Sequence, residues 1–186
     1  MTALKYSPLD DRHRALGARM GAFGGWEMPI SYAGTITEHT AVRQRAGVFD
    51  VSHLGKLLVR GDGAREDLDR ALTNRVADLE PGQARYSLIL NDDAGIIDDL
   101  IVYVLAPDRV LVVPNAANVD LVRDRVASVG AKVEPLDWAT PALQGPRARA
   151  ILNAVFPKAP ALPYLGVAEL DDGIVIARTG YTGEHG

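Results

Sequence analysis

The stretch Gly95-Ile96-Ile97-Asp98-Asp99-Leu100-Ile101-Val102-Tyr103-Val104-Leu105 sets two adjacent carboxylates into an apolar run of strand length. Side chains alternate between the two faces of a strand. Alternation predicts that Ile97, Asp99, Ile101, Tyr103 and Leu105 share one face, and that Ile96, Asp98, Leu100, Val102 and Val104 share the other. Both faces are apolar, so we expect both to be covered and at least one aspartate to enter surroundings of low dielectric constant, where a carboxylate needs a partner.

Two interpretations of these aspartates stay open. In the structural one, both carboxylates lie near a hairpin turn and accept hydrogen bonds from its backbone N–H groups. In the functional one, a carboxylate in the floor of a pocket orients or deprotonates a ligand amine. Asp99 is the better candidate for the second role, because it shares its expected face with Tyr103, an aromatic residue with a polar hydroxyl.

The segments around this stretch predict an α+β fold. Apolar runs at 86–90, 96–105 and 110–113 are separated by the turn compositions of 91–95 and 107–109, which is typical of an antiparallel meander. Strand 57–59 and helix 64–72 are expected before the meander, and helix 118–129 and strand 132–136 after it. The order contains runs of strands rather than strict strand–helix alternation, so a doubly wound parallel sheet is disfavoured.

The outer segments predict further helices and one glycine-rich loop. Ser7 and Pro8 have the composition of a helix start, with Gly17 as the stop. The remaining expectations are an ordered loop at 21–29, a helix at 35–45 opened by a capping box, a helix at 146–155 and a strand at 173–178.

Composition excludes several classes of protein. The chain has 186 residues, of which 47% are hydrophobic and 24% charged, with 20 Lys+Arg against 24 Asp+Glu and no cysteine. These values are typical of a folded globular protein.

The absence of cysteine rules out thiol nucleophiles, disulfides, Cys-ligated zinc and iron–sulfur clusters. The net charge of -4 disfavours nucleic-acid binding. Neither a signal peptide nor a membrane span is expected, so a cytoplasmic location is the default.

Single residues give weaker indications of chemistry. The histidines, His185 included, lack the H-x-x-x-H spacing of a zinc site, and no phosphate-binding glycine motif occurs. Asp50-Ser52-His53 resembles a compressed triad, but neighbours in sequence rarely point at one another, which favours a turn. Asn115 is either part of a helix approach or an amide that reads a heterocycle. Tyr181, between two glycine-containing turns, is the aromatic residue most expected at a site.

Taken together, five blocks identify a family. They are Gly25-Trp26-Glu27-Met28-Pro29, Gly47-Val48-Phe49-Asp50-Val51-Ser52-His53-Leu54-Gly55, Gly95-Ile96-Ile97-Asp98-Asp99-Leu100-Ile101-Val102, Leu143-Gln144-Gly145-Pro146 and Arg178-Thr179-Gly180-Tyr181-Thr182-Gly183-Glu184. In order and spacing, these blocks resemble the T-protein family of the glycine cleavage system, the tetrahydrofolate-dependent aminomethyltransferases. The resemblance runs from about Leu9 to the last residue.

The resemblance implies a one-carbon transfer. Enzymes of this family move the aminomethyl carbon from the dihydrolipoyl arm of the lipoylated H protein to tetrahydrofolate, releasing ammonia and forming methylenetetrahydrofolate. The family's essential aspartate falls on Asp99, whereas Asp98 fits less well because folate-binding relatives vary there. No metal is implied. The folate-lining positions implied are Leu54, Leu58, Tyr86, Asp99, Ile101, Tyr103, Asn115, Tyr164 and Tyr181. Leu54 stands where the family usually has Met, and the similar volume should preserve the contact.

The resemblance also implies a discontinuous domain organisation. Residues 1–54 and 141–186 should form an incomplete first folate-binding domain, and residues 55–140 a second, ferredoxin-like α+β domain that is also incomplete. A third, β-rich domain of the family and further folate contacts should lie past Gly186. We therefore expect the 186-residue chain alone to carry one wall of the folate cavity, to be inactive, and to be less soluble than its composition suggests.

Three alternatives remain open. The same fold occurs as a tail domain of dimethylglycine and sarcosine dehydrogenases, which carry a flavin domain before it; a start at Met1 followed by a helix disfavours this alternative. A folate-binding relative involved in iron–sulfur maintenance carries a Lys-Gly-Cys segment, and this chain has no cysteine. The third alternative is a binding module for folate or H protein without turnover.

Overall fold

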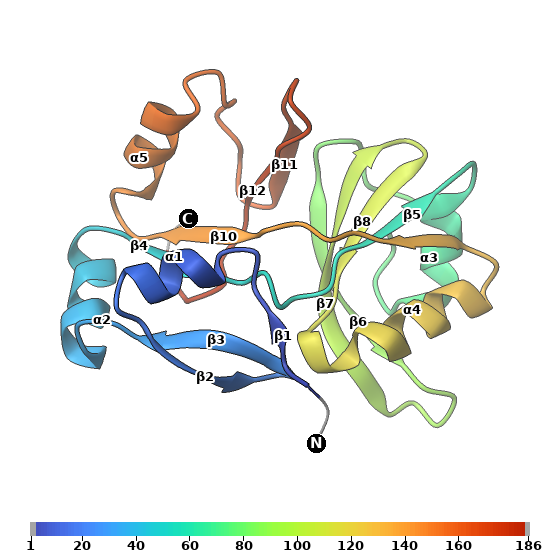
Figure 1. Cartoon of the computed structure of the whole chain (residues 1–186). Helices are drawn as coiled ribbons and strands as arrows, with labels where there is room; N and C mark the ends of the chain where they lie inside the picture. The colour runs from blue at the N-terminus through green and yellow to red at the C-terminus, as the bar shows by residue number, and fades with distance from the viewer. Residues whose placement is uncertain (1–2, 185–186) are drawn as a thin grey trace. The chain divides into compact units, whose positions relative to one another are not determined.

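The chain forms two units, each assembled from separate stretches of sequence. The computed structural model describes residues 3–184 (Figure 1), so His185 lies outside the described residues. Unit 1 comprises Met1–His53, Trp138–Ala161 and Thr179–Gly186, and unit 2 comprises Leu54–Asp137 and Leu162–Arg178. Residues 162–178, assigned to the first domain in the expected division, thus group with unit 2. Throughout residues 3–184, no helix has the length and apolar character needed to cross a bilayer.

Unit 2 is built on a five-stranded antiparallel sheet with the order β6-β7-β8-β5-β9. Its strands are β5 (Leu57–Arg60), β6 (Ala84–Leu90), β7 (Ile96–Ala106), β8 (Arg109–Val113) and β9 (Lys132–Pro135). The predicted meander β6-β7-β8 is confirmed. Two short turns joining strongly apolar strands make this pairing local, which is why the sequence pattern is sufficient to predict it.

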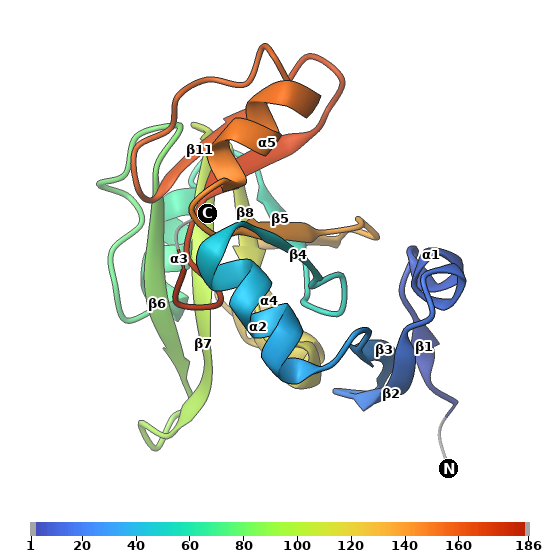
Figure 2. The ribbon, with the colours of Figure 1, turned by 90° about the vertical axis from the view of Figure 1, so that its left-hand side faces the viewer.

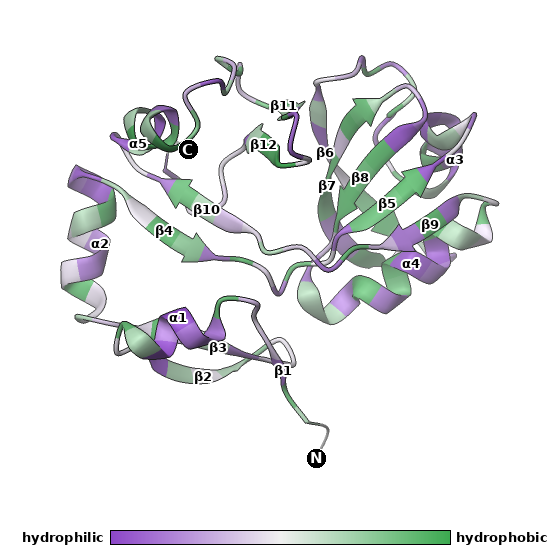
Figure 3. Ribbon diagram, turned by 45° about the horizontal axis from the view of Figure 1, so that its top comes forward, coloured by the Kyte–Doolittle hydropathy of each residue, from purple (hydrophilic) through white to green (hydrophobic). Residues whose placement is uncertain are grey.

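Helices α3 (Ala64–Ala71) and α4 (Val119–Ser128) contribute to a core on one face of this sheet. Their apolar residues recur at helical spacing, so each helix turns one apolar stripe inward, and polar residues make up much of the remainder (Figure 3). The fully buried side chains of this core include Leu57, Leu68, Val102, Val112, Val122 and Val126. The expected α+β architecture is therefore confirmed.

A bulge near the start of β7 changes the expected alternation. Ile89 pairs with Asp98 and Leu90 pairs with Ile96, so Ile97 is an extra residue between them. Ile97 packs against the core, whereas Ile96 is 67% exposed. The predicted faces of these two isoleucines are wrong, because an inserted residue shifts the strand alternation by one position. Asp98 keeps its expected place on the core side and is buried.

A second hairpin completes unit 2. Strands β11 (Gly166–Glu169) and β12 (Val175–Arg178) pair antiparallel, and β11 packs against β7. The expected strand at 173–178 corresponds to β12, whereas β11 was not predicted. Gly166 forms a β-bridge with Gln83, which places the start of β11 beside β6.

Unit 1 begins with a small sheet ordered β1-β3-β2 (Figure 2). It contains β1 (Lys5–Tyr6), β2 (Arg19–Phe23) and β3 (Trp26–Ser31). The predicted loop at 21–29 is wrong, because this segment is a hairpin. Gly24 and Gly25 have φ of 56° and 84°, and two consecutive positive φ values suit a tight turn between twisted strands. The glycines form the hairpin turn rather than interrupting regular structure.

Two predicted helix starts are shifted. Helix α1 spans Asp10–Ala15 and does not start at Ser7, whose hydroxyl oxygen instead accepts the backbone N–H of Leu9 at 3.0 Å. Helix α2 (Thr35–Gln44) has Gly34 as its N-cap rather than Thr35. Glu38 closes this end of the helix, because its Oε1 accepts the backbone N–H groups of Gly34 and Tyr32 at 2.7 and 2.8 Å.

Strands β4 (Gly47–Asp50) and β10 (Pro141–Gln144) pair antiparallel and join distant parts of unit 1. Neither strand was predicted, since each is only four residues long and its partner is remote in sequence. Beyond β10, helix α5 (Ala148–Val155) confirms the expected helix, although it begins two residues later than Pro146.

Candidate functional site

The face of the unit 2 sheet opposite the core carries five of the predicted site residues. Directly paired residues of antiparallel strands point to the same side of the sheet. Ile101 pairs with Tyr86 and Val113, while Tyr103 pairs with Leu111, which in turn pairs with Leu58. Along β7, Asp99 precedes Ile101 by two positions and Tyr103 by four, so its side chain points to the same side of the sheet as theirs. The register therefore places on one face Leu58, Tyr86, Asp99, Ile101 and Tyr103.

Burial on this face changes along β7. Leu58, Ile101 and Tyr103 are 2%, 8% and 8% exposed, whereas Tyr86 and Asp99 are exposed. The face thus has a buried, mainly apolar part and a more open end bearing a carboxylate and an aromatic hydroxyl. A mainly apolar surface with a few placed polar groups is typical of sites for small organic ligands.

Asn115 extends the polar end of the face. It lies two residues beyond Val113, the last residue of β8, and there continues the line of the Asp99 row. Its side-chain Nδ2 donates to the backbone oxygen of Asp99 at 3.0 Å and lies 3.3 Å from Asp99 Oδ1. A carboxylate and an amide therefore stand side by side on an exposed part of the sheet, which permits paired hydrogen bonding to a planar ligand edge.

Asp98 lies on the opposite side of β7 and is buried, with 3% exposure. Its carboxylate accepts the backbone N–H of Asn115 at 2.8 Å, Asn115 Nδ2 at 2.9 Å and Asn118 Nδ2 at 2.8 Å. The prediction that one aspartate is buried and partnered is confirmed. The structural interpretation for both acids is wrong for Asp98, whose partners come from 115–118 rather than from the hairpin turn.

The remaining predicted residues occupy separate positions. Leu54 is half-buried at the start of unit 2. Tyr164 is 63% exposed, in a turn whose next residue, Leu165, accepts the backbone N–H of Ala84 at 2.7 Å. This turn therefore adjoins the β6 end that carries the Tyr103 row. Tyr181 belongs to unit 1 and is 51% exposed, and partial burial raises the pKa of its phenol.

A second polar cluster, centred on Asp50, lies in unit 1. Asp50 Oδ2 lies 2.7 Å from His13 Nε2 and accepts the Ser7 hydroxyl, and Asp50 Oδ1 accepts the backbone N–H of Ser52 at 2.9 Å. Tyr32 completes the cluster, with its hydroxyl 2.7 Å from His13 Nδ1. Burial acts to raise the pKa of Asp50, but hydrogen bonds from Ser52, Ser7 and His13 outweigh it and lower that pKa.

This cluster is not the triad suggested by the sequence. Asp50 accepts hydrogen bonds from both the backbone N–H and the side chain of Ser52, and the His53 ring meets Phe23 edge-on with centroids 5.2 Å apart. The Ser7 hydroxyl and His13 converge on the same oxygen of Asp50. A serine held by the carboxylate has the geometry of a structural hydrogen bond rather than of a nucleophile activated by histidine. Ser52 and His53 lie in a turn, as expected, but Asp50 ends strand β4, so this turn follows a strand rather than helix α2.

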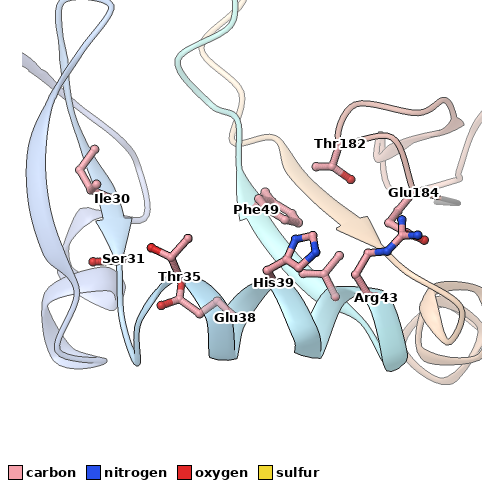
Figure 4. A pocket seen from close by; sticks show the side chains of 10 residues that line it. Ile30, Ser31, Thr35, Glu38, His39, Arg43, Phe49, Thr182 and Glu184 are labelled. Carbon is pink, nitrogen blue, oxygen red and sulfur yellow. The ribbon is translucent and has the colours of Figure 1, made fainter.

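Unit 1 also contains a pocket of about 340 Å³ along α2 (Figure 4). Its lining includes Glu38, His39 and Phe49, together with Arg43 and Glu184, which form an ion pair. Glu38 is already engaged by backbone N–H groups at the start of α2 and Arg43 pairs with Glu184, so these charged groups of the lining already have partners. Within residues 3–184, no group of three or more His, Asp or Glu side chains could hold a metal ion.

The fold and the Asp99 face together define a class of protein: a two-layer α+β module with helices on one face of its sheet and a carboxylate–amide pair on the other. Residues 9–186 match the model of the GCVT N-terminal domain family, and the chain belongs to this family. The family assignment from the five sequence blocks is thereby confirmed.

Individual relatives agree with this assignment. The aminomethyltransferase of Mycobacterium avium (strain 104) is 47% identical over 191 residues, covering 98% of this chain and 52% of the relative. That of Mycobacterium tuberculosis (strain H37Rv) is 46% identical over 195 residues, with the same coverages of 98% and 52%. The crystal structure of the glycine cleavage system aminomethyltransferase T from Bartonella henselae superposes with a TM-score of 0.93 at 40% identity, covering 98% of this chain and 52% of that one. The chain spans about half the length of the curated relatives it matches.

Proposed function

We propose that the protein is an aminomethyltransferase of the glycine cleavage system. In this proposal it moves the aminomethyl carbon from the dihydrolipoyl arm of the lipoylated H protein to tetrahydrofolate, releasing ammonia and forming methylenetetrahydrofolate. Support comes from relatives named aminomethyltransferase at 46–47% identity, which cover nearly the whole chain. The observation that carries the proposal for this chain's own residues is the exposed Asp99 carboxylate beside the amide of Asn115.

Asp99 is the proposed catalytic residue. The reaction replaces N–H bonds of the folate by bonds to the transferred carbon, so protons must leave the folate nitrogens. A carboxylate at hydrogen-bond distance can orient such an N–H and accept its proton. Asp99 suits this role because it is exposed, while the amide of Asn115 limits its freedom from one side. Asp98, buried under three donors, has no comparable access to a ligand.

The proposed folate contacts follow the same face of the sheet. Leu58, Ile101 and Tyr103 would pack against the apolar parts of the folate, and Tyr86 and Asn115 would lie at its polar edge. Leu54, Tyr164 and Tyr181 remain proposed contacts on grounds of family resemblance. The discontinuous domain division at 1–54, 55–140 and 141–186 and a cytoplasmic location likewise remain proposals.

The test is Asp99→Asn in the full-length protein, assayed with lipoylated H protein and tetrahydrofolate. The amide keeps the size of the side chain but cannot accept a proton, so we expect kcat to fall by about 100-fold or more while tetrahydrofolate binding is largely kept. Asp93→Asn, in the exposed turn before β7, is the matched control and should retain activity. Unchanged turnover in D99N would remove Asp99 from the catalytic role, and folate binding without turnover in the wild type would favour a binding module.

A further inference from the structure

Asp98 is a buried carboxylate to which the proposed reaction assigns no part. Burying a carboxylate is unfavourable unless hydrogen bonds replace its hydration. Asp98 satisfies this condition with three donors, of which Asn115 supplies two and Asn118 the third. Asn118 is also the N-cap of α4, the position expected from the sequence, yet its side-chain amide is directed to Asp98.

The carboxylate determines which way the Asn115 amide faces. A carboxylate in this environment only accepts, so Asn115 must turn its NH₂ group, rather than its carbonyl oxygen, toward Asp98. The same NH₂ group reaches the backbone oxygen of Asp99 and the vicinity of its Oδ1. With both aspartates on the NH₂ side, the carbonyl oxygen of Asn115 is directed away from them. The backbone N–H of Asn115 is fixed by the second oxygen of Asp98.

We propose that Asp98 is a positioning residue that acts through Asn115, holding its amide in one orientation against Asp99. This inference rests on the proposed function, because it assigns Asp98 to the support of the same site. The Asn115 NH₂ group donates to the buried Asp98 carboxylate and to the backbone oxygen of Asp99. The flipped amide would set its carbonyl oxygen against both acceptors, so the observed orientation is much more favourable.

The primary test is Asp98→Asn in the full-length protein. The new NH₂ group would face either the backbone N–H of Asn115 or the side-chain NH₂ groups of Asn115 and Asn118. In both placements a donor of Asn115 loses its acceptor, so the backbone or the side chain of Asn115 must move. We expect kcat to fall about tenfold or more, with a smaller change in the KM for tetrahydrofolate. The matched control is Asn118→Ala, which removes a donor to Asp98 without touching Asn115. It should lower thermal stability but keep kcat within about twofold of the wild type.

A double variant separates positioning from folding. Asp98→Asn combined with Asn118→Asp keeps one carboxylate in the cluster, now at position 118. This exchange restores a donor–acceptor pair between positions 98 and 118. The Asn115 amide, however, loses the carboxylate at position 98 as its partner. We expect it to fold more stably than D98N yet remain impaired in kcat. Recovery of kcat together with stability, or losses in D98N and N118A that are proportional to their stability losses, would overturn the proposal by making Asp98 purely structural.

A readout independent of turnover distinguishes this proposal from the proposed function. The side-chain NH₂ resonances of Asn115, assigned by NMR, should report a single, slowly rotating amide in the wild type and in N118A, and a markedly changed one in D98N. If the wild-type protein proves inactive in aminomethyl transfer but this pattern holds, the proposed function fails and the positioning role stands. Identical Asn115 resonances in wild type and D98N contradict the positioning role whatever the activity.

Discussion

His13 Nε2 lies 2.7 Å from Asp50 Oδ2, and this contact ties helix α1 to the end of strand β4. Both side chains are buried, at 9% and 1% exposure. Because His13 also lies 2.7 Å from the Tyr32 hydroxyl, the contact links three segments of unit 1 that are separate in sequence. The cluster thus connects segments of unit 1 through polar contacts. In unit 2, segments are connected by an apolar core, and this core contains no residue of unit 1.

Asp50 should make the stability of unit 1 dependent on pH. Hydrogen bonds outweigh burial and hold its pKa below the ordinary value of about 3.9. A carboxyl group with a lowered folded-state pKa stabilises the fold above the unfolded-state pKa, and this contribution is lost as the pH falls through the folded-state pKa. Asp50→Asn should therefore lower the free energy of unfolding by about 2 kcal/mol at pH 7, and by less below about pH 4.

Denaturant titrations of wild type, D50N and Asp11→Asn at neutral and acidic pH measure this effect. Asp11 is an exposed carboxylate on the same helix as His13 and serves as the control. A D50N deficit that stays constant as the pH falls would contradict the hydrogen-bonded role of the Asp50 carboxylate.

Leu68→Ala should destabilise unit 2 strongly. Leu68 is 0% exposed in the core beneath α3, so truncation removes buried apolar contacts and leaves a cavity. We expect a loss of about 3 kcal/mol in the free energy of unfolding. Leu121→Ala removes the same atoms from a side chain that is 60% exposed on α4, and should change stability by less than about 1 kcal/mol. Equal losses in the two variants would be incompatible with the described core.

Gly145→Ala should disrupt the contact between the start of the α5 segment and the end of α2. A Cβ at position 145 would lie 2.5 Å from the backbone oxygen of Val42 and 2.9 Å from Ala46 Cα, and Gly145 has φ of +119°. Gly34→Ala is the control, because Gly34 has φ of +113° but open space around the added atom. We expect about 1 kcal/mol for G34A and about 2 kcal/mol more for G145A, measured by thermal or denaturant unfolding. Similar losses of unfolding free energy in G34A and G145A would mean that backbone conformation, rather than the close contacts, determines the requirement for glycine at position 145.

The parts of the fold predicted from sequence are those set by local pattern. The strands of the meander and helices α3 and α4 carry their own apolar periodicity and end at turn-forming residues, so neighbouring positions suffice to define them. Strands β4 and β10 could not be predicted in this way, because four-residue strands carry little periodicity and each is stabilised by a partner remote in sequence. The hairpin at Gly24-Gly25 is a local feature too, but adjacent glycines suit a loop as well as a tight turn, so sequence pattern alone does not separate the two.

For the candidate site, period-two alternation was sufficient to group Asp99, Ile101 and Tyr103, and the register agrees with it. Alternation predicts the wrong face for Ile97. The cause is the bulge in β7, and nothing in the local pattern reveals where one strand gains a residue over its partner. The partners of Asp98 could not be predicted either. They lie beyond β8, and only the three-dimensional course of the chain brings Asn115 and Asn118 to it.

The pairing of β4 with β10 also has a kinetic consequence. The entire five-stranded sheet of unit 2 is encoded between these two strands, so during synthesis that sheet can form while β4 still lacks its partner. Contacts between remote segments form more slowly than local ones, because the intervening chain must be ordered first. The meander, with its short turns, would therefore nucleate folding, and the joining of the first two stretches of unit 1 through β4 and β10 would be a late step. In the nascent chain, β4 would meanwhile present unpaired backbone groups, a state in which strand edges are prone to intermolecular association.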